Sequence, residues 1–260
     1  MYLDYPLLLT GTIDATKYSD NITKICTEDR LRQYETSIER YIKETPFNKI
    51  VFIDNSDFEF DENKYLNMAS QYNKEFEFIH GTVCIREVQS YGKSYGDAFL
   101  IHEALHKSII LKDCEYFYKI TGRLFLMNSD KICKTRSKHK NEFIMYPYMG
   151  WCMTYIFKAN KKDYIEHLDD VYLDCNEKTL NDIEISFFKR LEKSGIDIGS
   201  FERYPYIDGV LGSTLKKYSG NIIERFIRNV MSRLHFFQYG SITSRLLGVI
   251  MKIKGMKSYI

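Results

Sequence analysis

The sequence predicts an α/β fold built on a doubly wound, mostly parallel sheet that is flanked by helices. Short apolar runs of strand length alternate along the chain with longer segments whose apolar residues recur at helical spacing. The run KIVFI at residues 49–53 is apolar almost throughout, which is typical of a parallel strand covered on both faces. The resulting order of strand, helix, strand, strand, helix and strand is that of a doubly wound sheet.

The individual elements follow from the same patterns. We expect strands at residues 5–12, 49–53, 76–79, 116–120 and 143–148. We expect one helix that begins at Thr27, with Thr27 as its N-cap, and another that begins at Ile222. Two further helices are expected at residues 96–111 and 180–194. Ligands of such sheets bind outside the carboxyl ends of the strands, so polar residues directly after the strands are the candidate site residues.

Length and composition exclude several classes of protein. A chain of 260 residues with 44% hydrophobic residues can bury the core of one large domain, which excludes general disorder. Its six cysteines are scattered without a CxxC pair or a His-Cys cluster, which argues against a zinc site and against a disulfide scaffold and fits a reducing compartment. The first residues lack the basic region of a signal peptide, and no apolar run approaches the ~18 residues of a membrane span. We therefore expect a cytoplasmic protein.

Residues 221–260 differ from the rest in charge. They carry a net +6, which leaves −4 for residues 1–220. The cations are Arg225, Arg228, Arg233, Arg245, Lys252, Lys254 and Lys257. Apolar residues recur between them at helical spacing, which predicts a basic amphipathic tail that lies on an anionic membrane surface after a domain of residues 1–220. The alternative is a helix that packs on the core or on another subunit; no nucleic-acid-binding module accompanies the charge.

Two candidate nucleotide-binding sets follow the first two strands. They are Thr10, Gly11 and Thr12 after the first strand, and Asp54, Asn55 and Ser56 after the second. A carboxylate at the second position can accept hydrogen bonds from a ribose or a base, and a glycine in the first turn lets the backbone approach a nucleotide. The alternative for the second set is an ordinary turn. The chain lacks GxGxxG and Walker motifs, which weighs against dinucleotide-binding and P-loop proteins.

A glycine turn opens the third candidate segment, GKSYGD at residues 92–97. Lys93 beside the start of a helix can bind a phosphate together with free backbone N–H groups. The alternative is an ordinary loop in which Asp97 is a first-turn acid.

The fourth strand ends in the segment KITGR, residues 119–123. If the strand continues, Lys119, Thr121 and Arg123 share one face because side chains alternate with a period of two. Two cations and a hydroxyl at this position, next to Gly122, can hold a diphosphate. A solvated edge strand is the alternative.

Two acids begin the helix expected at residues 180–194. Asp182 or Glu184 can remove a proton from an acceptor hydroxyl if this helix faces the strand ends. The alternative is that the helix dipole alone favours acids in its first turn.

Several of these segments together resemble small bacterial glycosyltransferases of capsule, O-antigen and lipooligosaccharide (lipopolysaccharide) clusters. The similar segments, which span residues 7–213, are LLLTGTID, RLRQYETSIERYI, KIVFIDNS, GKSYGD, YFYKITGRLF and IDGVLGS. The resemblance implies a GT-A-like fold in which the first strand and the acid after the second hold the nucleotide. It also implies that IDGVLGS places Asp208 and Gly209 on the acceptor side.

The resemblance departs from the broader GT-A pattern at one point that concerns metal binding. GT-A enzymes normally hold a divalent metal on the diphosphate through an acidic DxD motif after the fourth strand, where this chain has Lys119 to Arg123. We therefore expect metal-independent activity without a cofactor, with Mg²⁺ or Mn²⁺ as the alternative. The acids of inverting GT-A enzymes stand six or seven residues before an Arg-Leu pair, which implies Glu184 as the base. Asp182 is its rival, and Asp97 is a further catalytic candidate.

The expected function is transfer of a sugar from a nucleotide-diphosphate donor, with a UDP-sugar favoured, to a hydroxyl of a lipid-linked oligosaccharide. Such an enzyme would act peripherally on the inner face of the cytoplasmic membrane and could form a homo-oligomer. The alternatives are a nucleotidyltransferase and a non-catalytic scaffold of a polysaccharide assembly complex. The basic glycine-rich loop that a nucleotidyltransferase carries after its first strand is absent from residues 12–15.

Overall fold

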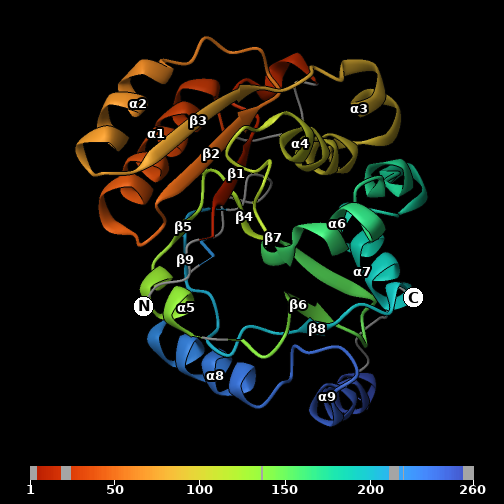
Figure 1. Ribbon diagram of the computed structural model, residues 1–260. Helices are drawn as coiled ribbons and strands as arrows, with labels where there is room; N and C mark the ends of the chain where they lie inside the picture. The colour runs from red at the N-terminus through yellow and green to blue at the C-terminus, as the bar shows by residue number, and fades with distance from the viewer. Residues whose placement is uncertain (1–4, 19–24, 136, 211–216, 219, 254–260) are drawn as a thin grey trace.

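The computed structural model describes residues 5–18, 25–135, 137–210, 217–218 and 220–253 (Figure 1). The main sheet has the strand order β3-β2-β1-β4-β7-β6-β8. Its strands are β1 (Leu7–Gly11), β2 (Lys49–Asp54), β3 (Glu75–His80), β4 (Tyr116–Thr121), β6 (Asn141–Tyr146), β7 (Trp151–Asn160) and β8 (Ile198–Gly199). A second sheet pairs β5 (Phe125–Leu126) with β9 (Ile207–Asp208).

Helices cover both faces of the main sheet. They are α1 (Thr27–Glu44), α2 (Glu62–Gln71), α3 (Ile85–Tyr91), α4 (Lys93–Lys107), α5 (Ser129–Lys134), α6 (Lys161–His167), α7 (Ile183–Ser194), α8 (Ile222–Arg233) and α9 (Ile242–Ile253). Short 3-10 helices are η1 (Ala15–Lys17), η2 (Val171–Asp174) and η3 (Glu177–Thr179). The neighbours β3, β2, β1 and β4 are all parallel, which confirms the predicted α/β class and mostly parallel sheet.

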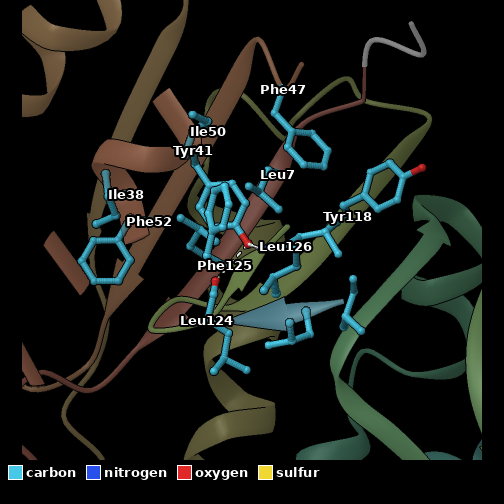
Figure 2. Packing of buried hydrophobic residues seen from close by; sticks show 14 of the residues in the cluster. Leu7, Ile38, Tyr41, Phe47, Ile50, Phe52, Tyr118, Leu124, Phe125 and Leu126 are labelled. Atoms are coloured by element: carbon cyan, nitrogen blue, oxygen red, sulfur yellow. Dashed lines mark hydrogen bonds between the residues drawn. The ribbon is translucent and has the colours of Figure 1, made fainter. Parts of the chain in front are cut away.

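Alternation along the strands divides the core into two layers. Leu7 and Leu9 of β1 point to the side covered by α1 and α2, and Leu8 points to the side covered by α4 and α7. Figure 2 shows the first layer, in which Tyr41 of α1 packs against Phe125 of β5, with 5.0 Å between the ring centroids. Both layers contain fully buried residues of the central strands. Their close packing fixes the positions of the carboxyl ends of these strands at one edge of the sheet.

Several elements differ from the sequence-based expectation. Strand β7 was not predicted, although it lies antiparallel between β4 and β6. Helices α2, α3, α5 and α6 and the short strands β5, β8 and β9 were also not predicted, and the basic tail forms two helices, α8 and α9. Cys26 is the N-cap of α1, so the expectation of Thr27 as the N-cap was wrong by one residue.

Candidate active site at the carboxyl end of β4

A buried lysine lies near the carboxyl end of β4. The Lys119 side chain is 3% exposed, and its Nζ donates to the Thr154 carbonyl at 2.8 Å and to Thr121 Oγ1 at 3.4 Å. Burial lowers the pKa of Lys119 to about 8, although the negative charges of Asp97 and Glu184 oppose this effect. Among the described residues no carboxylate forms an ion pair with Lys119, whereas the buried Lys158 pairs with Glu142 at 3.3 Å.

Thr154 also contacts the carboxylate of Glu184. Thr154 Oγ1 donates to Glu184 Oε1 at 3.3 Å, so one residue of β7 binds both Lys119 and Glu184. Burial, followed by repulsion from Asp182, raises the pKa of Glu184 to about 7. Asp182 is the N-cap of α7 and accepts from the Ile185 N–H at 2.9 Å, so part of its hydrogen-bonding capacity is used in the helix.

Two exposed residues of α4, Asp97 and Lys93, shift the pKa values of Lys119 and Glu184 through their charges. Asp97 raises the pKa of Lys119 and of Glu184, and Lys93 lowers the pKa of Glu184. The start of α4 does not offer free N–H groups to a phosphate in the way expected, because Glu177 Oε1 accepts from Ser94 N at 3.1 Å and from Ser94 Oγ at 2.6 Å. A carboxylate of the chain itself therefore occupies the anion position at this helix N-terminus.

Arg123 does not share the face of Lys119, because β4 ends at Thr121 and the chain then turns toward α1. The Arg123 guanidinium donates to Gln33 Oε1 at 3.1 Å and to the Val210 carbonyl at 3.3 Å. Its Nε is buried and has no hydrogen-bond partner among the described residues. The sequence-based expectation that Lys119, Thr121 and Arg123 lie on one strand face therefore holds for Lys119 and Thr121 alone.

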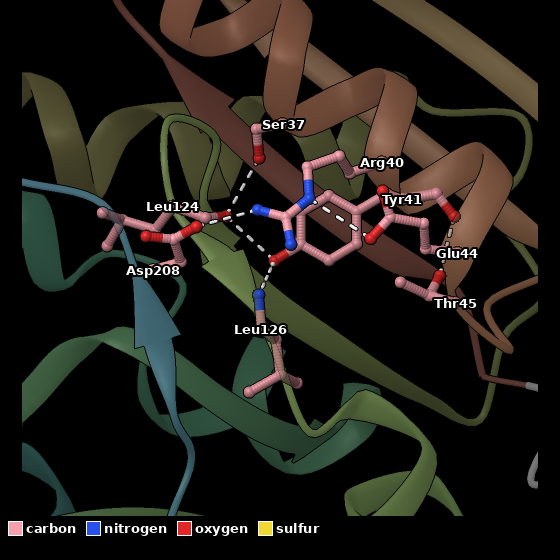
Figure 3. Close-up of polar contacts among 8 residues, drawn as sticks. All are labelled: Ser37, Arg40, Tyr41, Glu44, Thr45, Leu124, Leu126 and Asp208. Atoms are coloured by element: carbon pink, nitrogen blue, oxygen red, sulfur yellow. Dashed lines mark hydrogen bonds and ion pairs between the residues drawn. The ribbon is translucent and has the colours of Figure 1, made fainter. Parts of the chain in front are cut away.

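Arg123 lines a cleft of about 490 Å³ between α1 and the second sheet. Asp208 and Gly209 line the same cleft, so the structure brings the expected acceptor-side residues next to Arg123. Figure 3 shows that Asp208 pairs with Arg40 of α1, with 2.9 Å between Oδ2 and Nη1. The Tyr41 hydroxyl donates to the Leu124 carbonyl and accepts from Leu126 N–H, both at 2.9 Å, which fixes the chain directly after Arg123.

Tyr218 connects the cleft with the β4 site electrostatically. Burial raises the pKa of its hydroxyl to about 12; Arg123 opposes this, and Glu184 and Asp97 add to it. The Tyr218 N–H donates to the Gly209 carbonyl at 3.0 Å, so the backbone of this tyrosine is bound to a residue that lines the cleft. Residues 211–213, the end of the IDGVLGS segment, lie outside the described residues, as do Lys254 and Lys257.

The side chains that follow β1 and β2 largely bind one another. Asp54 accepts from Ile13 N–H at 2.6 Å and from Ser56 Oγ at 2.5 Å, and it is 2% exposed. Thr12 Oγ1 donates to Asn55 Oδ1 at 2.7 Å. These bonds hold the first and second strand ends together, and they give Asp54 a structural role besides the expected contact with a nucleoside.

Close packing explains both glycines at these strand ends. A Cβ on Gly11 would lie 2.6 Å from the Phe52 ring, and a Cβ on Gly122 would lie 3.1 Å from Tyr34 and from the carbonyl of Thr10, which is itself buried. The structure thus assigns both glycines to contacts within the protein. The expected approach of a nucleotide to Gly11 stays a prediction.

Three contributing residues were missed by the sequence analysis. Thr154 lies on a strand that was not predicted, Tyr218 lies outside the recognised segments, and Glu177 caps α4 from a 3-10 helix. No local pattern marks them, because each reaches the site through a contact with a residue far along the chain.

Comparisons with known proteins give fold-level similarity alone. No protein-family model and no curated protein matches the chain. Similar solved structures include the galactosyltransferase LgtC with donor and acceptor sugar analogues, at 9% identity over 76% of this chain and 74% of that chain, with a TM-score of 0.46. The bifunctional glycosyltransferase WbbM has 8% identity over 92% and 46% of the two chains, with a TM-score of 0.49. A nucleoside-diphosphate-sugar pyrophosphorylase from Vibrio cholerae RC9 has 14% identity over 74% and 89%, with a TM-score of 0.38.

The structural neighbours are thus glycosyltransferases and enzymes that form nucleotide sugars. At TM-scores below 0.5 the likeness carries no argument about activity, so what the chain does is inferred from its own site.

Proposed function

We propose that the chain is a glycosyltransferase that moves a sugar from a nucleotide-diphosphate donor, with a UDP-sugar favoured, to a hydroxyl of a lipid-linked oligosaccharide in surface polysaccharide synthesis. One observation carries the proposal: the buried Lys119, which no described carboxylate neutralises at close range, is joined through Thr154 to Glu184, whose pKa is near 7. A cation suited to a leaving phosphate thus lies beside a carboxyl suited to take up a proton.

In the proposed reaction Glu184 acts on the acceptor and Lys119 acts on the leaving diphosphate. The acceptor oxygen attacks the anomeric carbon as its proton passes to Glu184, and the bond from that carbon to the phosphate oxygen breaks. The nucleoside diphosphate leaves with the electron pair, and its growing negative charge is stabilised by Lys119, with Arg123 and Lys93 at longer range. Thr10, Gly11, Thr12, Asp54, Asn55 and Ser56 would border the nucleoside.

A divalent metal does not fit the position directly after β4. GT-A enzymes place carboxylates there, and in this chain Thr121 is followed by Gly122 and Arg123, with Lys119 buried behind them. Oxygen ligands are what Mg²⁺ requires, and a guanidinium offers donors alone. We therefore assign no step of the reaction to a metal.

Chelation provides a direct test of this assignment. We expect turnover to stay within about twofold of its starting value after dialysis against EDTA, because Lys119 and Arg123 supply the positive charge. Donor turnover should be measured well below the unfolding temperature, with and without added Mg²⁺ or Mn²⁺. Strict dependence on either ion would contradict the assignment.

Donor binding can be tested before any acceptor is known. Thermal unfolding should be followed with a panel of UDP-, GDP- and CMP-sugars, and we expect a UDP-sugar at about 100 times its Kd to raise the Tm by roughly 5–10 °C. The Lys119→Met variant should show a smaller shift. If no nucleotide stabilises the protein, a scaffold is favoured over an enzyme.

We propose further that α8 and α9 place the enzyme on an anionic membrane surface. Their apolar residues are unusually exposed, with Ile222 at 84% and Phe226 at 68%. Figure 1 shows both helices at the edge of the molecule away from α1 and α2. The exposed cations Arg233, Arg245 and Lys252 accompany this apolar surface, which suits a leaflet with negative headgroups. No helix among the described residues is long and apolar enough to cross a bilayer.

Vesicle sedimentation tests this surface. We expect binding to phosphatidylcholine vesicles that contain phosphatidylserine, and weaker binding to phosphatidylcholine alone or at high salt. Phe226→Glu should reduce the bound fraction at least about tenfold, because it removes apolar surface that the membrane would bury and adds repulsion between the new carboxylate and the anionic headgroups. The control is Ile109→Glu, since Ile109 is 82% exposed outside this surface. Equal binding by both variants would contradict the proposal.

A further inference from the structure

A cluster of two histidines and one aspartate lies outside the proposed active site. His102 and His106 are one helical turn apart on α4, and Asp169 follows α6. Asp169 Oδ1 lies 3.0 Å from His102 Nδ1, and Oδ2 lies 2.8 Å from His106 Nε2. One ligand atom from each of the three residues lies within 4.8 Å of the other two. This is the only group of its kind among the described residues.

Only one of the two contacts of Asp169 in this cluster is a hydrogen bond: its Oδ2 bonds to His106 Nε2 at 2.8 Å. His102 Nδ1 and Asp169 Oδ1 are both buried and, at 3.0 Å, are not aligned as a hydrogen bond, so each is without a hydrogen-bond partner among the described residues. The two histidine rings lie 4.5 Å apart and are tilted by 47°. Buried polar atoms are rarely left without a partner, and two that face each other call for a further group between their side chains.

We propose that His102, His106 and Asp169 bind a zinc ion. Histidines four residues apart on a helix present both rings to one ion, and imidazole with carboxylate is a common zinc ligand set. Tetrahedral coordination at about 2.0–2.1 Å places neighbouring ligand atoms about 3.4 Å apart, which small side-chain rotations reach from the observed distances. Three protein ligands leave the fourth position to water or to an exogenous ligand.

The ion would link α4 to the segment after α6 through its protein ligands. Helix α4 packs against η2, and the rings of Phe99 and Tyr172 already contact each other and His102 across this boundary. His102 lies about 8 Å along the helix axis from Asp97, at 1.5 Å per residue. None of the three proposed ligands belongs to the proposed active site, and the inference does not depend on the proposed sugar transfer.

Metal binding is measured on full-length protein without a polyhistidine tag, stripped with chelator and titrated with Zn²⁺ against a chromophoric chelator. We expect one tight equivalent per chain and a Tm rise of roughly 5–10 °C at about 100 times the Kd. Co²⁺ should give a d–d spectrum without a thiolate charge-transfer band, which separates this site from adventitious binding by Cys26, an exposed thiol. Because the readouts are stoichiometry, spectrum and Tm, they are unaffected if the proposed activity is absent.

Two variants make the test specific. His106→Ala should weaken Zn²⁺ binding at least about a hundredfold, and circular dichroism checks that this half-exposed position leaves the fold intact. His139→Ala should bind like the wild type, because His139 pairs with Asp197 at 2.7 Å and the described residues offer this pair no third ligand. Absence of a tight equivalent in the wild type, or unchanged affinity in His106→Ala, would overturn the proposal.

Discussion

Replacing Lys119 with methionine should lower kcat about 10²–10³-fold and leave the fold intact. Methionine keeps the length of the side chain and removes the charge that stabilises the leaving diphosphate. Stability should be unchanged or should rise, because the wild type buries a cation that no described carboxylate neutralises at close range. Steady-state kinetics and the Tm of both proteins check the two halves of this prediction.

Lys74 is the matched control for Lys119. Burial lowers its pKa to about 8 as well, and its Nζ donates to the Tyr41 and Thr45 carbonyls at 3.0 and 2.7 Å. It therefore shares the chemistry of Lys119 but lies between α1 and β3. Lys74→Met should change kcat less than about threefold. A small loss of activity in Lys119→Met, or an equal loss in Lys74→Met, would remove the basis of the proposed function.

The central strands and the position of Lys119 could be predicted because both depend on local pattern. The runs that became β1, β2 and β4 are mostly apolar, and this is what burial on both faces of a parallel sheet requires. The period of two placed Lys119 and Thr121 on one face of β4, and the structure brings Lys119 Nζ within 3.4 Å of Thr121 Oγ1.

The other half of the site could not be predicted because it depends on contacts between distant segments. Thr154 reaches Lys119 from 35 residues away, on a strand whose apolar run shows neither alternation nor helical period. For Arg123 the alternation argument failed for a physical reason: it holds only while the strand lasts. The chain leaves β4 at Thr121, and the buried Tyr41 then binds Leu124 and Leu126 and turns the chain toward α1.

Replacing Glu184 with glutamine should lower kcat/KM about 10²–10⁴-fold, because the amide cannot take up the acceptor proton. Asp182→Asn tests the rival base: asparagine still caps α7, so the helix is kept, and activity should change only a few-fold if Glu184 is the base. A severe loss in Asp182→Asn with an active Glu184→Gln would reverse the assignment.

The pH dependence of the wild type and of Glu184→Gln separates a catalytic base from a structural carboxyl. Because the pKa of Glu184 is raised to about 7, the wild-type kcat/KM should fall about tenfold per pH unit below pH 7, and Glu184→Gln should lose this dependence. The same shift means that ionised Glu184 lowers the free energy of unfolding. This destabilisation is absent below the unfolded pKa of 4.5 and is fully present above about pH 7.

Glu184→Gln should therefore have a higher Tm than the wild type at pH 8 and a similar Tm at pH 4. A carboxyl retained for stability would show the opposite, with a lower Tm in the variant at pH 8, so loss of activity together with a gain of stability identifies Glu184 as a group kept for its reaction.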